Sequence, residues 1–216
     1  MKFEKIIPEL KEYVRKEMGK GGAHDFDHIA RVLKIAERIG EAEGADLDVV
    51  FFATLFHDID RQREDKGEVS CHAESSAEHT RRLLRNYLLL PGDFIERVAV
   101  CIERHRFREG RTPESLEEKV LSDADKLDAM GATGIARAYI FGGAFGERVW
   151  EENPKNERFY PGMDVYEYSP RTEYVLKLSK LKEKMFTKTG RKLAERRHRF
   201  MEIFFEELEN EVIGDR

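Results

Sequence analysis

The chain has 216 residues, of which 38 are Lys or Arg and 43 are Asp or Glu, giving a formal net charge of -5. Hydrophobic residues make up 40% of the sequence, enough to bury a core and to argue against a disordered protein. No stretch without a charged residue is longer than the nine residues of 49–57, which is too short to span a bilayer, and the first residues lack the apolar segment of a secretory signal. Because the two cysteines form neither a disulfide framework nor a zinc-finger spacing, we expect a soluble, cytoplasmic protein.

Charged residues make up 38% of the chain, well above the roughly 25% of an average soluble protein. Such a surplus is typical of exposed helical surfaces. The mildly acidic balance argues against a protein that coats nucleic acid. The basic run at residues 191–199 alternates with acidic stretches, so we interpret it as a solvated helix face.

The periodicity of apolar residues is helical along nearly the whole chain, and no segment alternates in the manner of a strand. Helices are expected over residues 3–18, 25–43, 49–56, 70–90, 93–102, 112–130 and 131–140, and two charged helices that divide near Gly190 are expected after residue 170. Segment 49–56 is apolar on all sides, which fits a buried strand or a central helix; its helical neighbours favour the helix. The predicted fold class is all-α.

Polar residues at the ends of these segments predict where several helices begin. The expected caps are Asp25 or Asp27, Asp46 or Asp48, Ser70 after a charged loop at 60–68, and Thr112 followed by Pro113. The last helix carries an apolar stripe that either closes the core or forms the seam of a homodimer. The stripe comprises Leu193, Arg197, Phe200, Phe204 and Leu208.

Six of the seven histidines lie between positions 24 and 105, several of them beside carboxylates. The doublet His57-Asp58 directly follows the most apolar segment, and His28 lies near the start of the second helix. Imidazole nitrogen and carboxylate oxygen together suit Mn, Fe, Co, Ni or Zn. Because a buried His-Asp pair without a metal leaves an unmatched charge in the core, this pattern predicts a divalent-metal site.

In order and spacing, His28, His57-Asp58 and Asp125 resemble the H…HD…D signature of the HD superfamily of metal-dependent phosphohydrolases. Wider stretches around these residues resemble one small bacterial and archaeal branch, often called YedJ-like; they are residues 24–32, 55–59, 72–74 and 123–132. The resemblance covers about residues 20–140 and implies an HD-domain helical bundle with a C-terminal helical extension. We expect the HD-type domain to occupy residues 1–145, with residues 146–216 packing on it.

The resemblance implies ligands for a principal divalent ion, which would be Mn, Fe, Co, Ni, Zn or Mg. These ligands are His28, His57, Asp58 and Asp125. Asp125 is preferred to Asp123 and Asp128 because the family's ligand precedes a basic residue, here Lys126.

Some related branches hold a second ion, for which the resemblance implies His72 and His105 as ligands and Asp58 as a bridge. Where the related dinuclear enzymes have a His-His pair, this chain has His105-Arg106, so one ion and two ions both remain open.

The resemblance implies hydrolysis of a phosphate ester by metal-activated water, because a divalent ion lowers the pKa of bound water toward ~7. Asp58 would carry the metal chemistry, and Lys126, Arg31 and Arg61 would hold the phosphate. The expected substrate is a small phosphorylated molecule, with a nucleotide favoured. The alternatives are an HD-type di-iron oxygenase and a non-catalytic metal- or nucleotide-binding regulatory module.

Other features are assigned lesser roles. His24 could act as an acid or support a ligand, and Asp60 could orient water or cap its loop. Residues 139–146 are glycine-rich but lack the Lys-Ser/Thr of a phosphate-binding loop, so they are expected to end a helix. Residues 142–170 contain no motif that predicts a function.

Overall fold

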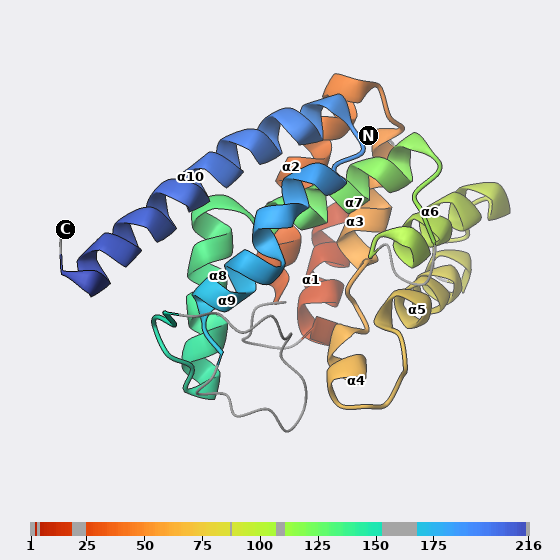
Figure 1. Cartoon of the computed structure of the whole chain (residues 1–216). Helices are drawn as coiled ribbons and strands as arrows, with labels where there is room; N and C mark the ends of the chain where they lie inside the picture. The colour runs from red at the N-terminus through yellow and green to blue at the C-terminus, as the bar shows by residue number, and fades with distance from the viewer. Residues whose placement is uncertain are drawn as a thin grey trace. The chain divides into compact units, whose positions relative to one another are not determined.

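A computed structural model of the chain describes residues 3, 5–18, 25–86, 88–106, 111–152 and 168–214 (Figure 1). All regular structure in these residues is helical, which confirms the predicted all-α class. None of their helices is long and apolar enough to cross a membrane. The chain divides into two compact units, residues 1–125 and 126–216, and the boundary falls inside α7 (Leu116–Asp128). The predicted division at residue 145 stays a prediction.

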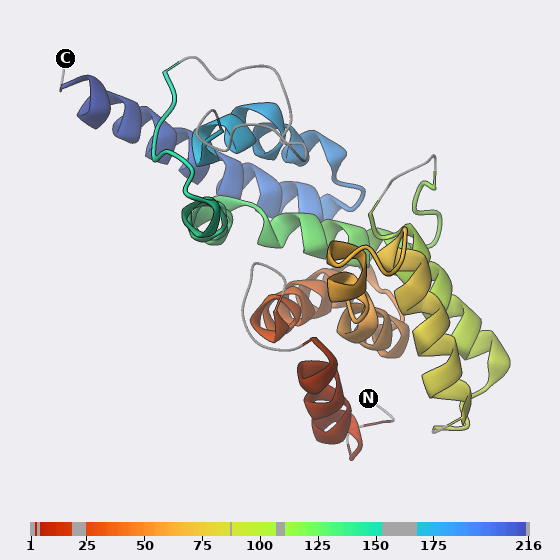
Figure 2. The same ribbon diagram turned by 90° about the horizontal axis from the view of Figure 1, so that it is seen from below.

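The first unit is built around α3 (Leu47–Phe56). This helix contacts α1 (Ile7–Met18), α2 (Phe26–Glu43), α5 (His72–Asn86) and α6 (Gly92–Arg104), and α5 and α6 run side by side in Figures 1 and 2. Phe52, Leu55 and Phe56 of α3 are fully buried. A segment that is apolar on every side therefore forms a central helix, as its helical neighbours predicted.

Side-chain hydrogen bonds decide between the alternatives predicted for two helix caps. Asp25 caps α2 by accepting the backbone N–H groups of Asp27 and His28, and Asp46 caps α3 in the same manner. Gly44 ends α2 with φ of 80°, a left-handed conformation that glycine adopts without a steric penalty.

The cap predicted at Thr112 is wrong, because α7 begins only at Leu116. Ser115 Oγ accepts the backbone N–H of Glu118 at 3.2 Å, and Glu118 Oε1 accepts the backbone N–H of Ser115 at 3.3 Å. These reciprocal bonds form a capping box, which satisfies two backbone donors and outweighs the upstream Thr-Pro signal.

The segment predicted as a charged loop contains a short helix, α4 (Arg61–Asp65), with an ion pair of 3.2 Å between its first and last residues. The prediction that Ser70 caps the next helix is also wrong. Helix α5 begins at His72, whose backbone N–H donates to Glu64 Oε2 at 3.2 Å. It ends at Asn86 rather than at residue 90, before Leu89 adopts φ of 50°, which does not continue a helix.

The second unit contains α8 (Gly131–Phe145), α9 (Pro170–Leu176), the 3₁₀ helix η2 (Leu178–Lys184) and α10 (Lys188–Ile213). Both α8 and η2 pack against α10, and α9 packs against α8 and η2. The predicted division near Gly190 lies a few residues too late, because Thr187 Oγ1 accepts the Gly190 N–H at 2.9 Å and caps α10. As predicted, the glycine-rich segment ends a helix, at Gly146 with φ of 73°.

The apolar stripe predicted for α10 is not the face that the unit buries. The buried residues are Gly190, Ala194, His198, Met201 and Phe205, one position along from the predicted set. Phe200 of that set is 48% exposed. Because apolar residues occupy both neighbouring stripes, the sequence does not distinguish which one the packing of η2 and α8 covers.

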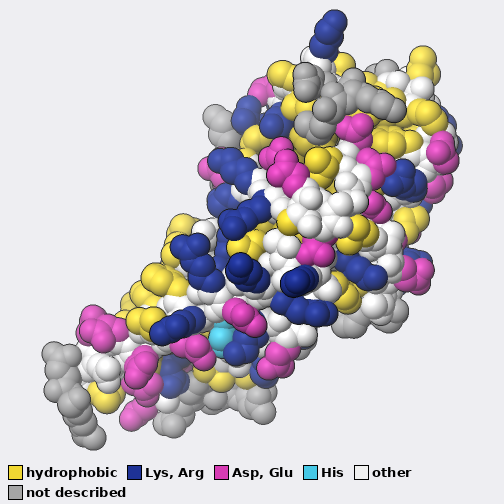
Figure 3. Space-filling model, turned by 90° about the horizontal axis from the view of Figure 1, so that it is seen from above, with side chains coloured by type: hydrophobic (Ala, Val, Ile, Leu, Met, Phe, Trp, Pro, Cys, Tyr) yellow, Lys and Arg dark blue, Asp and Glu magenta, His cyan; other side chains and the backbone are white. Residues whose placement is uncertain are grey.

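The charged surface agrees with the interpretation of a solvated exterior. Lys and Arg side chains are interspersed with Asp and Glu over the face shown in Figure 3. Of the segment 142–170, residues 153–167 lie outside the described residues.

Candidate metal centre

The turn that follows α3 carries His57 and Asp58 into the interior of the first unit. His57 is the C-terminal cap of α3 in right-handed helical conformation, and both side chains are buried. The two side chains are buried because α3 is apolar on all sides and lies in the core, so its C-terminal end lies there too. The sequence thus delivers an imidazole and a carboxylate to a site with little access to water.

One face of this doublet meets His28 from α2 and Asp125 from α7. His28 Nε2 lies 3.3 Å from His57 Nε2 and 3.5 Å from Asp125 Oδ1, and the distance from His57 Nε2 to Asp125 Oδ1 is 3.9 Å. Asp58 Oδ2 is 3.8 Å from each of the two imidazole nitrogens. Ligands bound at about 2.1 Å around one ion lie roughly 3.0–3.4 Å apart. His28, His57 and Asp125 form a group that could hold a metal ion.

The other oxygen of Asp58 meets a second pair of histidines. Oδ1 lies 2.9 Å from His72 Nε2 and 3.7 Å from His105 Nε2. His57, Asp58 and His105 form a second group that could hold an ion. The Asp58 carboxylate therefore lies between two pairs of imidazole nitrogens, an arrangement that suits a bridging ligand.

Backbone carbonyls fix the orientation of two of these rings. His57 Nδ1 donates to the Thr54 carbonyl at 2.8 Å, and His105 Nδ1 donates to the Ile102 carbonyl at 2.6 Å. A carbonyl oxygen can only accept, so Nδ1 carries the proton in both rings and Nε2 presents a lone pair. Each ring is thus held with Nδ1 on the backbone, and Nε2 is the nitrogen available to a metal.

His72 is oriented by a residue that the sequence analysis missed. Its Nδ1 contacts Glu64 Oε2, and Arg106 Nη1 binds the same carboxylate at 3.2 and 2.9 Å. Burial raises the pKa of Glu64, but the His72 hydrogen bond and the Arg106 charge outweigh it and lower the pKa to about 2. Arg106 thus holds in place the carboxylate that orients His72. This is the position at which the resemblance to dinuclear enzymes implied a second histidine. Only the fold of α4 toward α5 brings Glu64 to this position.

The buried donors fit a divalent cation. His72 Nε2 is buried and has no hydrogen-bond partner among the described residues, although Asp58 Oδ1 is 2.9 Å away. Burial lowers the pKa of His57 to about 4, outweighing the Asp58 charge, which raises it. Burial also raises the pKa of Asp125, but the facing His57 and His28 outweigh it and keep that pKa below its ordinary value. At neutral pH His57 is therefore neutral and Asp125 is ionised, which are the metal-binding forms of these two groups.

Comparison with known proteins identifies the family to which the chain belongs. The family profile of the HD domain matches residues 25–130. YpgQ of Bacillus subtilis is 34% identical over 220 residues, which cover 99% of this chain and 97% of YpgQ. The chain belongs to the HD-domain family.

Solved HD-family structures match over nearly the full chain. The crystal structure of B. subtilis YpgQ in complex with ADP has a TM-score of 0.74 at 33% identity, covering 97% of this chain and 99% of that one. An HD-superfamily hydrolase from Bacillus thuringiensis has a TM-score of 0.72 at 28% identity, with 98% of each chain covered. The predicted superfamily is confirmed, and the YedJ-like branch stays a prediction.

Within this HD domain, Asp60 ties the turn after the doublet to α5. Its carboxylate accepts from Ser75 Oγ, from Arg63 at 3.3 Å and from His79 Nδ1 at 3.1 Å. His79 Nε2 in turn lies 2.9 Å from the Tyr13 hydroxyl of α1. Of the two roles predicted for Asp60, these contacts support the structural one.

The three cations that were predicted to hold phosphate have different surroundings from one another. Arg61 pairs with Asp65 at 3.2 Å, Arg31 is partly buried on α2, and Lys126 Nζ lies 5.3 Å from the centre of the Phe186 ring. Their role in holding phosphate stays a prediction.

Asp123 and Asp128 are the two aspartates to which Asp125 was preferred as a ligand. Asp128 forms an ion pair of 2.8 Å with Arg137, and Asp123 is fully buried in α7. His24 lies outside the described residues.

Proposed function

We propose that the protein is a metal-dependent phosphohydrolase that cleaves a phosphomonoester or phosphodiester of a small molecule, with a nucleotide as the favoured substrate. The observation that carries this proposal is the buried Asp58 carboxylate, which faces His28 and His57 with one oxygen and His72 and His105 with the other. Membership of the HD superfamily of hydrolases supports the reaction class.

The principal ion would be held by four residues. They are His28, His57, Asp58 and Asp125. Mixed nitrogen and oxygen donors favour Mn, Fe, Co, Ni or Zn over Mg, which prefers oxygen. When bound, such an ion lowers the pKa of a coordinated water and polarises phosphoryl oxygens. A second ion would be held by His72 and His105, with Asp58 shared.

Backbone carbonyls and one carboxylate of the chain hold the proposed histidine ligands in place before an ion binds. The Thr54 and Ile102 carbonyls hold the rings of His57 and His105 in place, and the Glu64 carboxylate holds the ring of His72. The low pKa of Asp125 keeps its carboxylate ionised at neutral pH. The site is thus preorganised for a divalent ion.

The nucleotide preference has its support in a relative. B. subtilis YpgQ, which is 33% identical to this chain, has been crystallised in complex with ADP. Arg31, Arg61 and Lys126 are the cations that we propose hold the phosphate groups. The cytoplasmic location and a homodimer stay predictions.

The decisive experiment combines metal analysis with an activity screen. The purified protein is loaded with each candidate ion and incubated with nucleotides, cyclic nucleotides and sugar phosphates, and phosphate or pyrophosphate release is measured. We expect one or two divalent ions per chain and turnover that Asp58→Ala abolishes. Two irons with an oxygen-dependent reaction would favour the oxygenase instead. Bound metal without turnover of any substrate would favour the regulatory module.

A further inference from the structure

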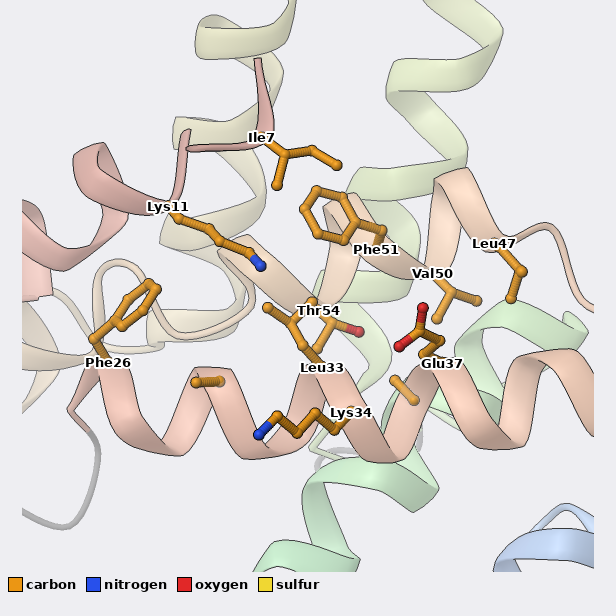
Figure 4. A pocket seen from close by; sticks show the side chains of 12 residues that line it. Ile7, Lys11, Phe26, Leu33, Lys34, Glu37, Leu47, Val50, Phe51 and Thr54 are labelled. Carbon is orange, nitrogen blue, oxygen red and sulfur yellow. The ribbon is translucent and has the colours of Figure 1, made fainter. Parts of the chain in front are cut away.

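A pocket lies between α1, α2 and α3 (Figure 4). Its volume of about 340 Å³ falls in the range of small-molecule sites. Most of its lining is apolar, including Phe26, Leu33, Val50 and Phe51. None of the histidines or aspartates around the Asp58 carboxylate lines it, so it is a separate cavity of the first unit.

One lining residue carries an unsatisfied polar group. Thr54 is fully buried, and its hydroxyl has no hydrogen-bond partner among the described residues. A threonine inside a helix ordinarily bonds a carbonyl one turn earlier, which removes the cost of burying the hydroxyl. The hydroxyl is enclosed, so a ligand in the pocket reaches it only after the side chains that cover it shift. A hydrogen bond to the ligand would then remove the cost of burying the hydroxyl unpaired.

The pocket also holds a cation, Lys11, for which the described part of the chain provides no carboxylate partner. Figure 4 shows Lys11 extending from α1 toward the middle of the pocket. Among the described residues, the contact made by its ammonium is with the Phe51 ring, 5.9 Å from the ring centre. Lys34 contributes a second ammonium and Glu37 the single carboxylate, so the lining has a formal charge of +1.

We propose that this pocket binds a small apolar carboxylate of the fatty-acid class. The acyl chain would lie among the aromatic and aliphatic side chains, and the carboxylate would meet the Lys11 ammonium and the Thr54 hydroxyl. Two ammonium groups against one carboxylate favour an anion over an apolar cation. A nucleotide fits poorly, because its phosphates require several convergent donors and the lining offers two ammonium groups and one hydroxyl.

Isothermal titration of the full chain with decanoate, below its micelle concentration, tests this proposal. We expect saturable binding at one site. Lys11→Met keeps the unbranched apolar stem of the side chain and removes the charge, so it should weaken decanoate binding by about tenfold or more. Lys16→Met is the matched control, because Lys16 is an exposed lysine of the same helix that does not line the pocket. Decanol, which has no charge, should bind more weakly than decanoate.

A second variant keeps the test independent of Lys11. Thr54→Val preserves the shape of the side chain and removes the unpaired hydroxyl, so it should raise the thermal stability of the free protein and weaken decanoate binding. Absence of saturable binding, equal affinity for decanol, or unchanged affinity in both variants would overturn the proposal. Because the readout is binding, its failure is distinct from a failure of the proposed hydrolase activity.

Discussion

Oδ1 of Asp58 lies 2.9 Å from Nε2 of His72, yet within the described part of the chain this nitrogen forms no hydrogen bond. Nδ1 of the same ring is directed at the Glu64 carboxylate, which can only accept, so in the neutral ring Nδ1 carries the proton and Nε2 presents a lone pair. Two acceptor atoms at this distance repel one another. A cation shared between them removes that repulsion, which makes Asp58 the residue on which metal binding should depend most.

Replacing Asp58 with Asn tests that dependence. The amide keeps the size of the side chain but removes the charge that both histidine pairs face, so we expect tightly bound metal to be lost. The loss should exceed the ~10–100-fold typical of removing a residue that only supports a ligand. Elemental analysis after dialysis measures it, and circular dichroism checks that the helices remain. Asp65→Asn is the control, because that carboxylate is 56% exposed and pairs with Arg61 on the surface. Wild-type metal content in the Asp58 variant would contradict the assignment.

Glu64→Gln tests whether the Glu64 carboxylate holds His72 in its metal-binding orientation. Glutamine keeps the length but accepts a proton less strongly and loses the ion pair with Arg106. If His72 binds an ion, we expect the affinity for that ion to fall by about 10–100-fold, measured by competition with a chelator.

The control for this variant is Glu68→Gln, whose carboxylate is 51% exposed and pairs with Arg63. An unchanged affinity for every bound ion in Glu64→Gln would mean that only the site of His28, His57, Asp58 and Asp125 is used. The experiment therefore also decides between one ion and two.

The sequence predicts the centre of this site well because its signals are local. His57-Asp58 follows an all-apolar helix, and such a helix must be central, so the doublet must be buried. Glu64 could not be predicted, because its place beside His72 depends on how α4 folds back against α5. The buried face of α10 was missed for a similar reason. Phe200 and Met201 lie on adjacent stripes of one amphipathic helix, and the packing partners decide which stripe is covered.

Two glycines of the second unit should respond oppositely to alanine. Gly131 has φ of 72°, and an added Cβ would lie 3.1 Å from Arg197 Cγ, so Gly131→Ala should lower the free energy of unfolding by about 1–3 kcal/mol. Gly143 lies inside α8 with no neighbouring atom within 4 Å of an added Cβ. Gly143→Ala should therefore stabilise the protein by up to about 1 kcal/mol. Denaturant titration measures both, and a loss of stability in Gly143→Ala would contradict the described geometry of α8.

Glu147 should make the stability of the protein depend on pH. Burial raises the pKa of its carboxyl, and the charge of Glu173 raises it further. The folded state therefore holds the proton more tightly than the unfolded state, and ionised Glu147 costs stability once the pH rises above the ordinary value of 4.5. Below that value both states are protonated, and the cost disappears.

Glu147→Gln removes this cost and should raise the melting temperature at pH 7, by no more than about 3 °C because the carboxyl is partly screened by solvent. The gain should shrink at pH 4, where the wild-type carboxyl is already mostly neutral in the folded state. Differential scanning calorimetry at both pH values measures the difference, and Glu207→Gln on the exposed face of α10 is the control. A gain of the same size at pH 4 and pH 7 would show that the substitution acts through packing against Gly142, which the Glu147 carboxylate overlies, rather than through its charge.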